Sequence, residues 1–408
     1  MSETKALGTK PTGPLSGVRI VDLTSVVFGA YATQMLGDYG ADVIKVEAPS
    51  PTGGGGQGGD IMRWAGKLPE GASPDMGPIF LTINRNKRSV LLDLRKKSAV
   101  DALKSLIKSA DVLASNIRYE GMKRLGLSYE DVKAIKPDIV FVHAAGYDLI
   151  QAGSGSADLL SRVDGDPKPR YVPTLMADKV SGLFMANAIT AALFHRERTG
   201  DGQFVEVPMF EAITSFVLAE HFYGHVFDPA TGPWSYGRVT NPDRRPYKTK
   251  DGYIGLLPYS DKQWNQFFEI AGRPGAFKDD PRFATYKART QNIRELYAML
   301  EELTEMKTTQ EWLDALLPLS IPVVKMNRLD DLPDDPHLKA VGFFERYDHP
   351  HAGPYFALRP PVRFSGTPAN IRRHPPRLGE QTREVLSELG LDAALIDEIE
   401  SEEAATGK

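Results

Sequence analysis

Short apolar strands alternate with helical segments through the first half of the chain, and this alternation restricts the fold more than any other feature. Buried strands are predicted at residues 18–23, 42–47, 89–94, 111–115 and 138–143. Segments with helical signals lie between them, such as residues 30–39, which end before Gly40. Parallel strands need such crossover connections, so the pattern predicts a doubly wound α/β domain with a parallel sheet.

A different pattern begins after about residue 215. A segment rich in Gly, Pro and Asn at 232–245 indicates a linker, and KDGY at 250–253 indicates a hairpin turn. Helices are then predicted over 261–271, 290–306, 309–316 and 381–389. We therefore expect three parts: a large domain over 14–220, a small α+β domain over 235–325, and a C-terminal segment over 326–408.

The amino-acid composition excludes several kinds of site. The chain has no cysteine, which excludes disulfides, zinc–thiolate sites, iron–sulfur clusters and a cysteine nucleophile. Its formal net charge is −4, so nothing indicates a nucleic-acid partner. His221 and His225 have no third ligand nearby in sequence, so no metal site is expected. No stretch approaches ~18 consecutive apolar residues and the first residues lack an apolar core, so we expect a cytoplasmic protein without a membrane span.

Several nucleotide-binding and hydrolase motifs are missing. Glu47 ends the second predicted strand as a ribose-binding acid would, but the loop at 24–30 (TSVVFGA) lacks the glycines of a dinucleotide site. The glycine-rich segment 49–59 is not followed by a phosphate-binding lysine motif, so we predict a surface or lid loop there, with its glycines at 53–59. No nucleophile elbow of the Gly-x-Ser-x-Gly type occurs.

One acid lies where a helical pattern begins in the segment 171–212. Asp178 precedes apolar residues at helical spacing, and the helix is predicted to end before Gly200. We predict that Asp178 lies on a turn that opens this helix, where free N–H groups and the helix dipole favour an anion. From the local sequence alone it is either an N-cap or an anionic nucleophile.

Basic residues gather near the predicted strand ends. They are Lys87, Arg88, Arg95, Arg118, Lys123 and Arg124. Ligands of doubly wound sheets bind outside the carboxyl ends of the strands. These residues form either a solvated face or a pocket for a polyphosphate, to which arginine donates forked hydrogen bonds.

A series of short motifs runs through nearly the whole chain. It begins with PLSGVRIVDL at 14–23 and GADVIKVE at 40–47, and continues through NKRS at 86–89, RLGL at 124–127, AD at 177–178, SG at 181–182, KDGY at 250–253, DDPRF at 279–283 and LGE at 378–380. In this order the motifs resemble the class III CoA-transferases, the family of formyl-CoA transferase and carnitine CoA-transferase. The sequence is thereby identified as a member of that family.

The resemblance implies a fold, an assembly and a reaction. The fold would be a Rossmann-like large domain and a smaller domain, with the chain returning to the large domain, in an interlocked, ring-like homodimer. The reaction would move CoA from an acyl-CoA to a free carboxylic acid, with no tightly bound cofactor and no metal. Asp178 would be the nucleophile, with Tyr147 near it. CoA would contact Val27, Phe28, Ala48, Leu92, Asp93, Leu94, Arg95, Asn116, Ile117, Arg118 and Arg124.

Such a nucleophile must be ionised. An aspartate with a pKa near ~3.9 is ionised at pH 7 by a factor of roughly a thousand. Burial would raise this pKa, and we expect the N–H groups at the start of its own helix to oppose that increase.

Two alternatives stay open. The α-methylacyl-CoA racemases are also similar, but they carry His-Asp where this chain has Tyr147 and Asp148. Tyrosine, with a pKa near ~10, is a poor base for moving a proton at neutral pH. A CoA-binding protein without turnover would keep the basic residues but would not need Asp178. Ser25 stands where formyl-CoA transferase has a histidine, so the acyl donor and the acceptor acid are left open.

Overall fold

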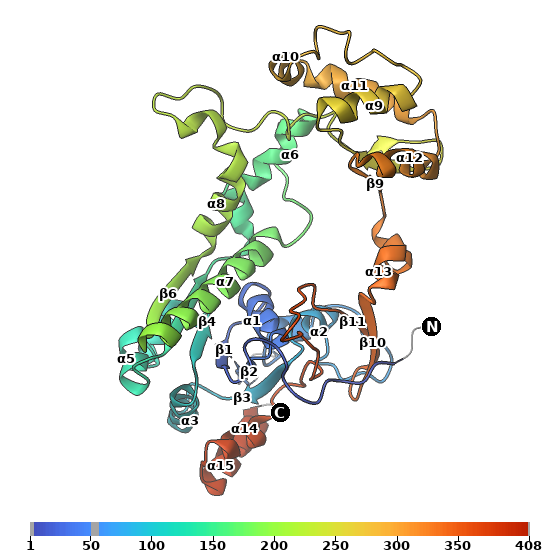
Figure 1. Ribbon diagram of the computed structural model, residues 1–408. Coiled ribbons are helices and arrows are strands. Elements are labelled where there is room, and N and C mark those ends of the chain that lie inside the picture. Colours follow the sequence, from blue (N-terminus) through green and yellow to red (C-terminus); the bar gives the residue numbers. More distant parts are fainter. Residues whose placement is uncertain (1–3, 50–56, 407–408) are drawn as a thin grey trace. The chain divides into compact units, whose positions relative to one another are not determined.

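A six-stranded sheet is the main element of the computed structural model, which describes residues 4–49 and 57–406. Its strands are β1 (Arg19–Leu23), β2 (Asp42–Glu47), β3 (Lys87–Leu91), β4 (Val112–Ser115), β5 (Val140–Ala145) and β6 (Gln203–Pro208). The strand order is β3-β2-β1-β4-β5-β6 and all neighbours are parallel, which confirms the predicted parallel sheet (Figure 1). The order reverses between β1 and β4, so ligand sites are expected beyond their carboxyl ends, Leu23 and Ser115.

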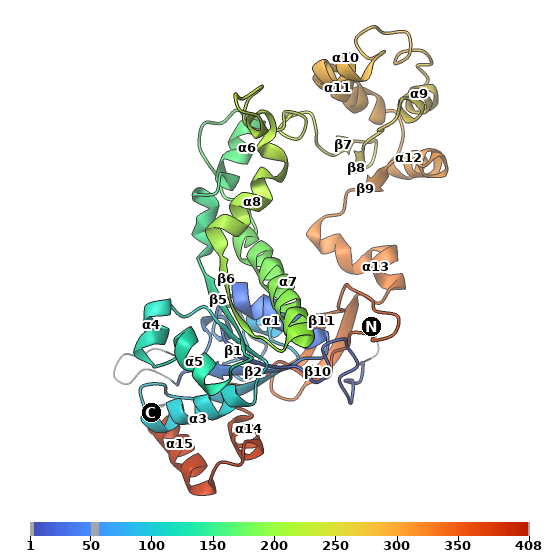
Figure 2. The ribbon, with the colours of Figure 1, turned by 60° about the vertical axis from the view of Figure 1, so that its left-hand side comes forward.

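Helices cover both faces of this sheet (Figure 2). One face packs on α1 (Phe28–Asp38) and α7 (Met176–Thr199), and the other on α3 (Lys97–Lys108), α5 (Tyr129–Ile135), α14 (Thr382–Glu388) and α15 (Ala393–Thr406). Successive strand residues alternate between the two cores: Ile20 belongs to the first and Val21 to the second. Both faces are therefore apolar, which explains the nearly continuous apolar strands in the sequence.

The chain divides into two compact units. The first takes in the chain up to Ser154, then Val172–Phe216, and then the segment that begins at Ala340. Besides the sheet and its covering helices it contains η1 (Ile61–Arg63), α2 (Pro78–Ile83), α4 (Tyr119–Arg124), η2 (Asp148–Ala152) and the antiparallel pair β10 (Phe344–His349) and β11 (Gly353–Leu358). The last part of the chain thus rejoins the unit that holds the parallel sheet.

The second unit consists of Gly155–Tyr171 and Val217–Lys339. It holds α6 (Ser156–Asp164), the end of α8 (Met209–His221), the antiparallel strands β7 (Tyr247–Lys248), β8 (Tyr253–Leu256) and β9 (Val323–Lys325), and the helices α9 (Asp261–Ile270), α10 (Tyr286–Gln291), α11 (Ile293–Thr304), α12 (Thr309–Leu316) and α13 (Pro336–Ala340), whose last residue is in the first unit. Short 3-10 turns complete it: η3 (Tyr223–Val226), η4 (Leu317–Leu319) and η5 (Leu329–Asp334). The predicted KDGY turn joins β7 to β8, and capping boxes at Ser260 and Thr308 open α9 and α12.

Two of the predicted basic residues have a structural role instead of facing a ligand. The third strand begins at Lys87, so Lys87 and Arg88 lie at its amino end, opposite the edge where ligands bind. The Lys87 ammonium is fully buried, 3.0 Å from a carboxylate oxygen of Asp22. Arg88 pairs with Asp42 at 2.6 Å and with acids of α14. For these two cations neither alternative holds: they form neither a solvated face nor part of a polyphosphate pocket.

The described residues offer neither a membrane-spanning helix nor a cluster of metal ligands. No helix in the described part of the chain is long and apolar enough to cross a membrane. No group of three or more His, Asp or Glu side chains within residues 4–49 and 57–406 is placed to hold a metal ion. Most of the predicted glycine-rich lid lies outside the described residues.

Candidate active site

Asp178 is the third residue of α7, not part of a preceding turn. Leu175 is the N-cap of this helix, so Asp178 is not the cap and the predicted position is wrong by one helical turn. Ala177, the second residue of the helix, is fully buried in the core that α1 and α7 form with the sheet. Asp178 is buried, with 6% of its surface exposed, and the backbone N–H of Phe28, the first residue of α1, is near enough to its carboxylate to lower its pKa.

A glycine allows the two helices to approach this closely. Gly182 lies one turn after Asp178, on the same face of α7. A Cβ atom at Gly182 would stand 2.9 Å from the carbonyl oxygen of Phe28 and 3.2 Å from the ring of Tyr31. Any other residue would push α7 away from α1, so Gly182 sets the contact between the carboxylate and the start of α1.

Asp148 supports the start of α7 from another element. It opens η2, just beyond the carboxyl end of β5, and its Oδ1 accepts a hydrogen bond from the backbone N–H of Ala177 at 3.0 Å. Its Oδ2 accepts a bond from Gln151 Nε2 at 2.8 Å. Asp148 therefore caps α7 in place of Leu175, which has no side chain able to do so. It was missed as a site residue, although an acid directly after a parallel strand was a usable signal.

The electrostatics of Asp178 differ from the expectation. Burial raises the pKa of its carboxyl, the negative charge of Asp148 raises it further, and the backbone N–H of Phe28 opposes them, with a result of about 6. The expected protection by the start of its own helix is thus outweighed, first by burial and then by the negative charge of Asp148. At pH 7 the carboxylate form still predominates by about ten to one.

The loop between β1 and α1 is held by one side chain from the segment after β4 and one from the segment after β2. Asn116, which follows β4, accepts a hydrogen bond from the Ser25 N–H at 3.0 Å and donates one to the Ser25 carbonyl at 2.9 Å. Val26 has a φ of 66°, a left-handed conformation that is costly for a β-branched residue. Its N–H donates to Asp60 Oδ1 at 3.1 Å, so the strained residue is tied down next to the start of α1.

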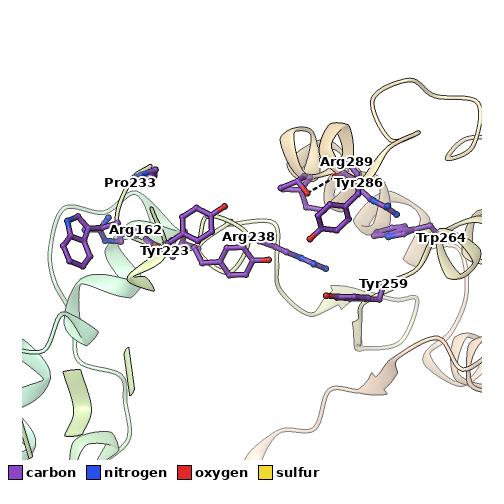
Figure 3. Close-up of a pocket in the computed structure, with 15 residues that line it drawn as sticks. Arg162, Tyr223, Pro233, Arg238, Tyr259, Trp264, Tyr286 and Arg289 are labelled. Atoms are coloured by element: carbon purple, nitrogen blue, oxygen red, sulfur yellow. Dashed lines mark hydrogen bonds between the residues drawn. The ribbon is translucent and has the colours of Figure 1, made fainter. Parts of the chain in front are cut away.

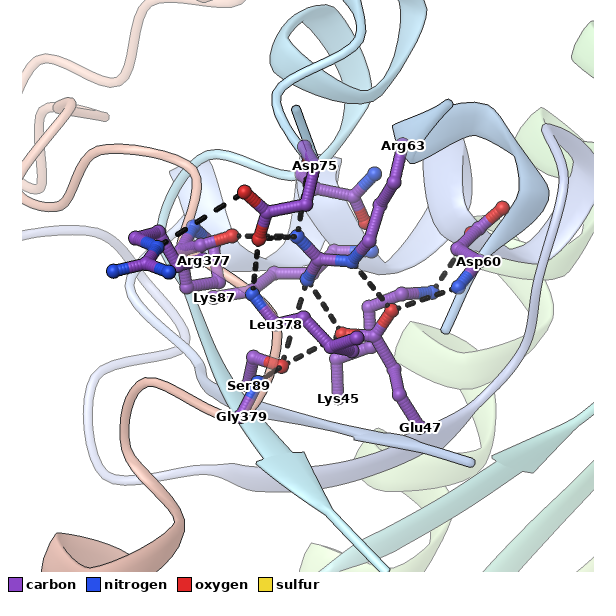
Figure 4. Close-up of polar contacts among 12 residues, drawn as sticks. Lys45, Glu47, Asp60, Arg63, Asp75, Lys87, Ser89, Arg377, Leu378 and Gly379 are labelled. Carbon is purple, nitrogen blue, oxygen red and sulfur yellow. Dashed lines mark hydrogen bonds and ion pairs between the residues drawn. The ribbon is translucent and has the colours of Figure 1, made fainter. Parts of the chain in front are cut away.

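A buried ionic network extends from this loop to the C-terminal segment (Figure 4). Lys45 Nζ donates to the Thr24 carbonyl at 2.6 Å and lies 3.0 Å from Asp60 Oδ2, and both side chains are fully buried. Burial alone would raise the pKa of Glu47, but the adjacent guanidinium of Arg63 lowers it to about 2. Arg63 also donates to the Pro376 carbonyl at 2.9 Å. The C-terminal segment thereby supports the loop that leads to α1, whose first residue lies beside Asp178.

A cavity of about 540 Å³ opens at the carboxyl ends of β1 and β2. Six of the residues predicted to contact CoA line it: Ala48, Leu92, Asp93, Leu94, Arg95 and Ile117. They are joined by the loop and network residues Thr24, Ser25, Lys45, Glu47 and Asp60. Its size is within the range of small-molecule sites, and its position is where ligands of such sheets bind.

The other predicted residues do not line this cavity. Val27 and Phe28 are buried at the start of α1, and Asn116 holds the loop as described above. Arg118 and Arg124 are exposed on the segment after β4. Tyr147 is 64% exposed, and its hydroxyl oxygen is 3.4 Å from Arg118 Nη2, which donates to it. Arg95, at the cavity, pairs with Asp93 at 2.7 Å.

Comparisons with known proteins agree on one family. The model of CoA-transferase family III matches residues 15–382. A succinate–glutarate CoA-transferase of Agrobacterium fabrum is 31% identical over 395 residues, which cover 92% of this chain and 96% of that protein. A formyl-CoA:oxalate CoA-transferase of Afipia carboxidovorans is 31% identical, with 92% and 93% of the chains covered. A crystal structure of a CAIB/BAIF family protein from Brucella suis superposes with a TM-score of 0.73 at 30% identity, covering 93% of this chain and all of that one.

Proposed function

The chain belongs to CoA-transferase family III, whose members transfer CoA between acyl-CoA and carboxylic acids, and we propose that here the transfer passes through a thioester on Asp178. One observation carries the proposal. A buried carboxylate with a pKa of about 6 lies beside the backbone N–H of Phe28, the first residue of α1, and is not used to cap its own helix. It is charged at neutral pH, yet poorly solvated, which favours nucleophilic attack.

The proposed reaction has four steps. The Asp178 carboxylate attacks the thioester carbonyl, the C–S bond breaks, and a mixed anhydride and the CoA thiolate result. The thiolate attacks the Asp178 carbonyl of the anhydride and releases the donor acid as a carboxylate. The acceptor carboxylate then attacks the aspartyl-CoA thioester, and the released thiolate attacks the acceptor side of the new anhydride. Asp178 is regenerated, and no net proton or water is consumed.

The start of α1 is suited to stabilise the tetrahedral intermediates. The N–H groups in the first turn of a helix have no partner within the helix, and Val27, the N-cap of α1, makes no side-chain capping bond. Negative charge that develops on a carbonyl oxygen next to Asp178 would meet these N–H groups and the positive end of the helix dipole. The contact between Phe28 and Asp178 supports this assignment.

We place CoA in the cavity of the first unit. The residues from Ala48 and from Leu92 to Arg95 supply one wall, and Ile117 another. Arg118 and Arg124 are exposed cations on the segment after β4, free to contact phosphates outside the cavity. Tyr147 remains a candidate residue near the nucleophile, because Asp148, its neighbour, contacts the start of α7.

We also propose that the enzyme is an interlocked homodimer. Large apolar side chains of α7 and α8 are 40% exposed or more, namely Leu183, Phe184, Phe194, Phe210 and Phe216. Exposed apolar groups in this number indicate a surface that another protein covers. A second copy is the simplest partner, since most soluble oligomers are homodimers.

Replacement of the nucleophile tests the proposed function. Asp178→Ala should abolish transfer while leaving the Kd for CoA within about threefold, because the side chain does not line the CoA cavity. Asp201→Ala, which removes an exposed acid just after α7, should leave both unchanged. Transfer activity retained in Asp178→Ala would refute the role of Asp178. Loss of CoA binding together with activity would point to misfolding, which circular dichroism would detect.

A further inference from the structure

A second cavity, of about 570 Å³, lies within the second compact unit (Figure 3). Tyrosine and tryptophan rings dominate its wall, including Tyr223, Tyr236, Tyr259, Trp264 and Tyr286. They come from η3, the linker after it, the loop after β8, α9 and α10. None of these residues lines the CoA cavity, and none of them takes part in the proposed chemistry of Asp178. Rings of this kind favour flat or apolar ligands, and each tyrosine adds a polar hydroxyl.

The charges that line this cavity all have one sign. Arg162, Arg238 and Arg289 contribute guanidinium groups, while none of the described lining residues is an aspartate or glutamate. Arg162 pairs with Asp158, and Arg289 pairs with Asp261 at 2.6 Å, but neither acid faces the cavity. An electropositive, partly enclosed space of this kind raises the local concentration of anions.

Arg238 is the cation without a countercharge. Among the described residues no carboxylate lies within ion-pairing distance of it, and its Nε donates to the hydroxyl of Tyr297 at 3.0 Å. Its guanidinium carbon is 5.3 Å from the ring centre of Tyr259, so the group is partly buried against an aromatic face. Figure 3 shows Arg238 extending across the cavity toward Tyr259. A half-buried, unpaired guanidinium gains more from a bound anion than an exposed one does.

Arg289 adds a second unsatisfied group. Only 7% of its surface is exposed, and in the described structure its Nη1 is buried without a hydrogen-bond partner. The guanidinium is packed against Phe277 at 5.1 Å and Tyr286 at 5.8 Å. The Nη2 side of the group is paired with Asp261, but a buried N–H donor such as Nη1 costs free energy while it has no partner. Tyr286, whose ring lies beside this guanidinium, is 65% exposed.

We propose that this cavity binds a small organic carboxylate, with its carboxylate on Arg238 and its apolar body among the tyrosine rings. The flat guanidinium matches a carboxylate with two parallel hydrogen bonds, and the ring-lined wall excludes water from the rest of the ligand. The volume is within the range of small-molecule sites. This inference does not depend on the proposed role of Asp178.

A ligand-observed NMR titration of the full-length protein tests the proposal with phenylacetate, phenylacetamide and inorganic phosphate as probes. Phenylacetate should bind, and the uncharged amide should bind at least tenfold more weakly, because it cannot pair with Arg238. Arg238→Met should weaken phenylacetate binding at least tenfold and leave the amide unchanged. Arg245→Met is the matched control, since Arg245 is exposed, pairs with Glu301 and does not line the cavity.

The proposal would be overturned by no binding of phenylacetate, by equal binding of acid and amide, or by binding unaffected by Arg238→Met in a protein with an unchanged melting temperature. Phosphate that binds as tightly as phenylacetate would also overturn it, in favour of an unselective anion site. The titration is repeated in Asp178→Ala, where binding should persist even though transfer is lost. Transfer kinetics of Arg238→Met show which acid the cavity binds. If the KM for the acceptor acid alone increases, the bound acid is the acceptor substrate. If that KM is unchanged, the bound acid is a different one.

Discussion

The pH dependence of the first chemical step tests the electrostatics of Asp178. Its carboxyl has a pKa of about 6, against 3.8 for an ordinary aspartate. The difference is roughly two pKa units, or about 3 kcal/mol by which the site disfavours the charged form. Only that form attacks the thioester. Hence kcat/KM for acyl-CoA should be near its plateau at pH 7, where about nine-tenths is ionised, and fall about tenfold by pH 5.

Asp148→Asn should move this profile toward lower pH. Burial is the larger cause of the raised pKa and remains, but the negative charge of Asp148 also raises it and is removed. Asparagine keeps an oxygen for the N–H of Ala177, so the start of α7 stays capped. The CoA phosphates also titrate near pH ~6, but they are the same for both proteins. The displacement between the two profiles therefore reports on Asp178.

The assay is kcat/KM for one acyl-CoA with an uncharged acyl group, measured from about pH 5 to pH 8 on the wild type, Asp148→Asn and Asp166→Asn. Asp166 is exposed and serves as the control that should leave the profile unchanged. Melting temperatures at each pH establish that all three proteins stay folded. A flat profile for the wild type, or superimposable profiles for the wild type and Asp148→Asn, would refute the raised pKa or its electrostatic cause.

Three further substitutions test other parts of the structure. Gly182→Ala should lower transfer ~10-fold or more and cost roughly 1–3 kcal/mol of stability, because its Cβ would stand 2.9 Å from a backbone oxygen. Gly366→Ala is the control, since the space around Gly366 is open, and equal effects of the two substitutions would contradict this reason. Asp178→Asn should raise the free energy of unfolding by up to ~3 kcal/mol at pH 8 and by less at pH 5. The reason is that the charge on Asp178 destabilises the folded state progressively as the pH rises from the pKa of the unfolded state to the higher pKa of the folded state. A gain that is independent of pH in urea titrations would exclude this cause. Phe194→Asp should convert a dimer into monomers in light scattering, whereas a monomeric wild type would rule out the proposed assembly.

Local sequence rules predicted most of the parallel sheet. The strand at 42–47 has the predicted bounds. The capping box between Ser128 and Asp131 that opens α5 is likewise formed by residues three apart in sequence. These features depend on neighbours within a few residues. By contrast, Lys87 looked like a ligand-binding cation because its partner, Asp22, lies 65 residues away in sequence. Burial of a charged pair cannot be recognised without the tertiary structure.

In the candidate site, too, local features could be predicted, whereas features that depend on residues distant in sequence could not. Asp178 was identified from its motif and its position near a helix start, but the helix begins earlier than predicted, and it is capped at Ala177 by Asp148, which lies 29 residues before Ala177. The pKa could not be predicted either, since burial and the charge of Asp148 decide it. The cavity around Arg238 was missed altogether, because its walls come from separate segments with no shared motif.

Intact-protein mass spectrometry after brief mixing with acyl-CoA tests the central claim most directly. In the absence of an acceptor acid, the enzyme should gain the mass of one CoA less one water, and peptide mapping should place this adduct on Asp178. Hydroxylamine should remove it, because a thioester is cleaved by that nucleophile. Asp178→Ala should show no adduct under the same conditions. A wild-type enzyme that completes transfer without any such adduct, or that carries it on another residue, would contradict the aspartyl-CoA intermediate.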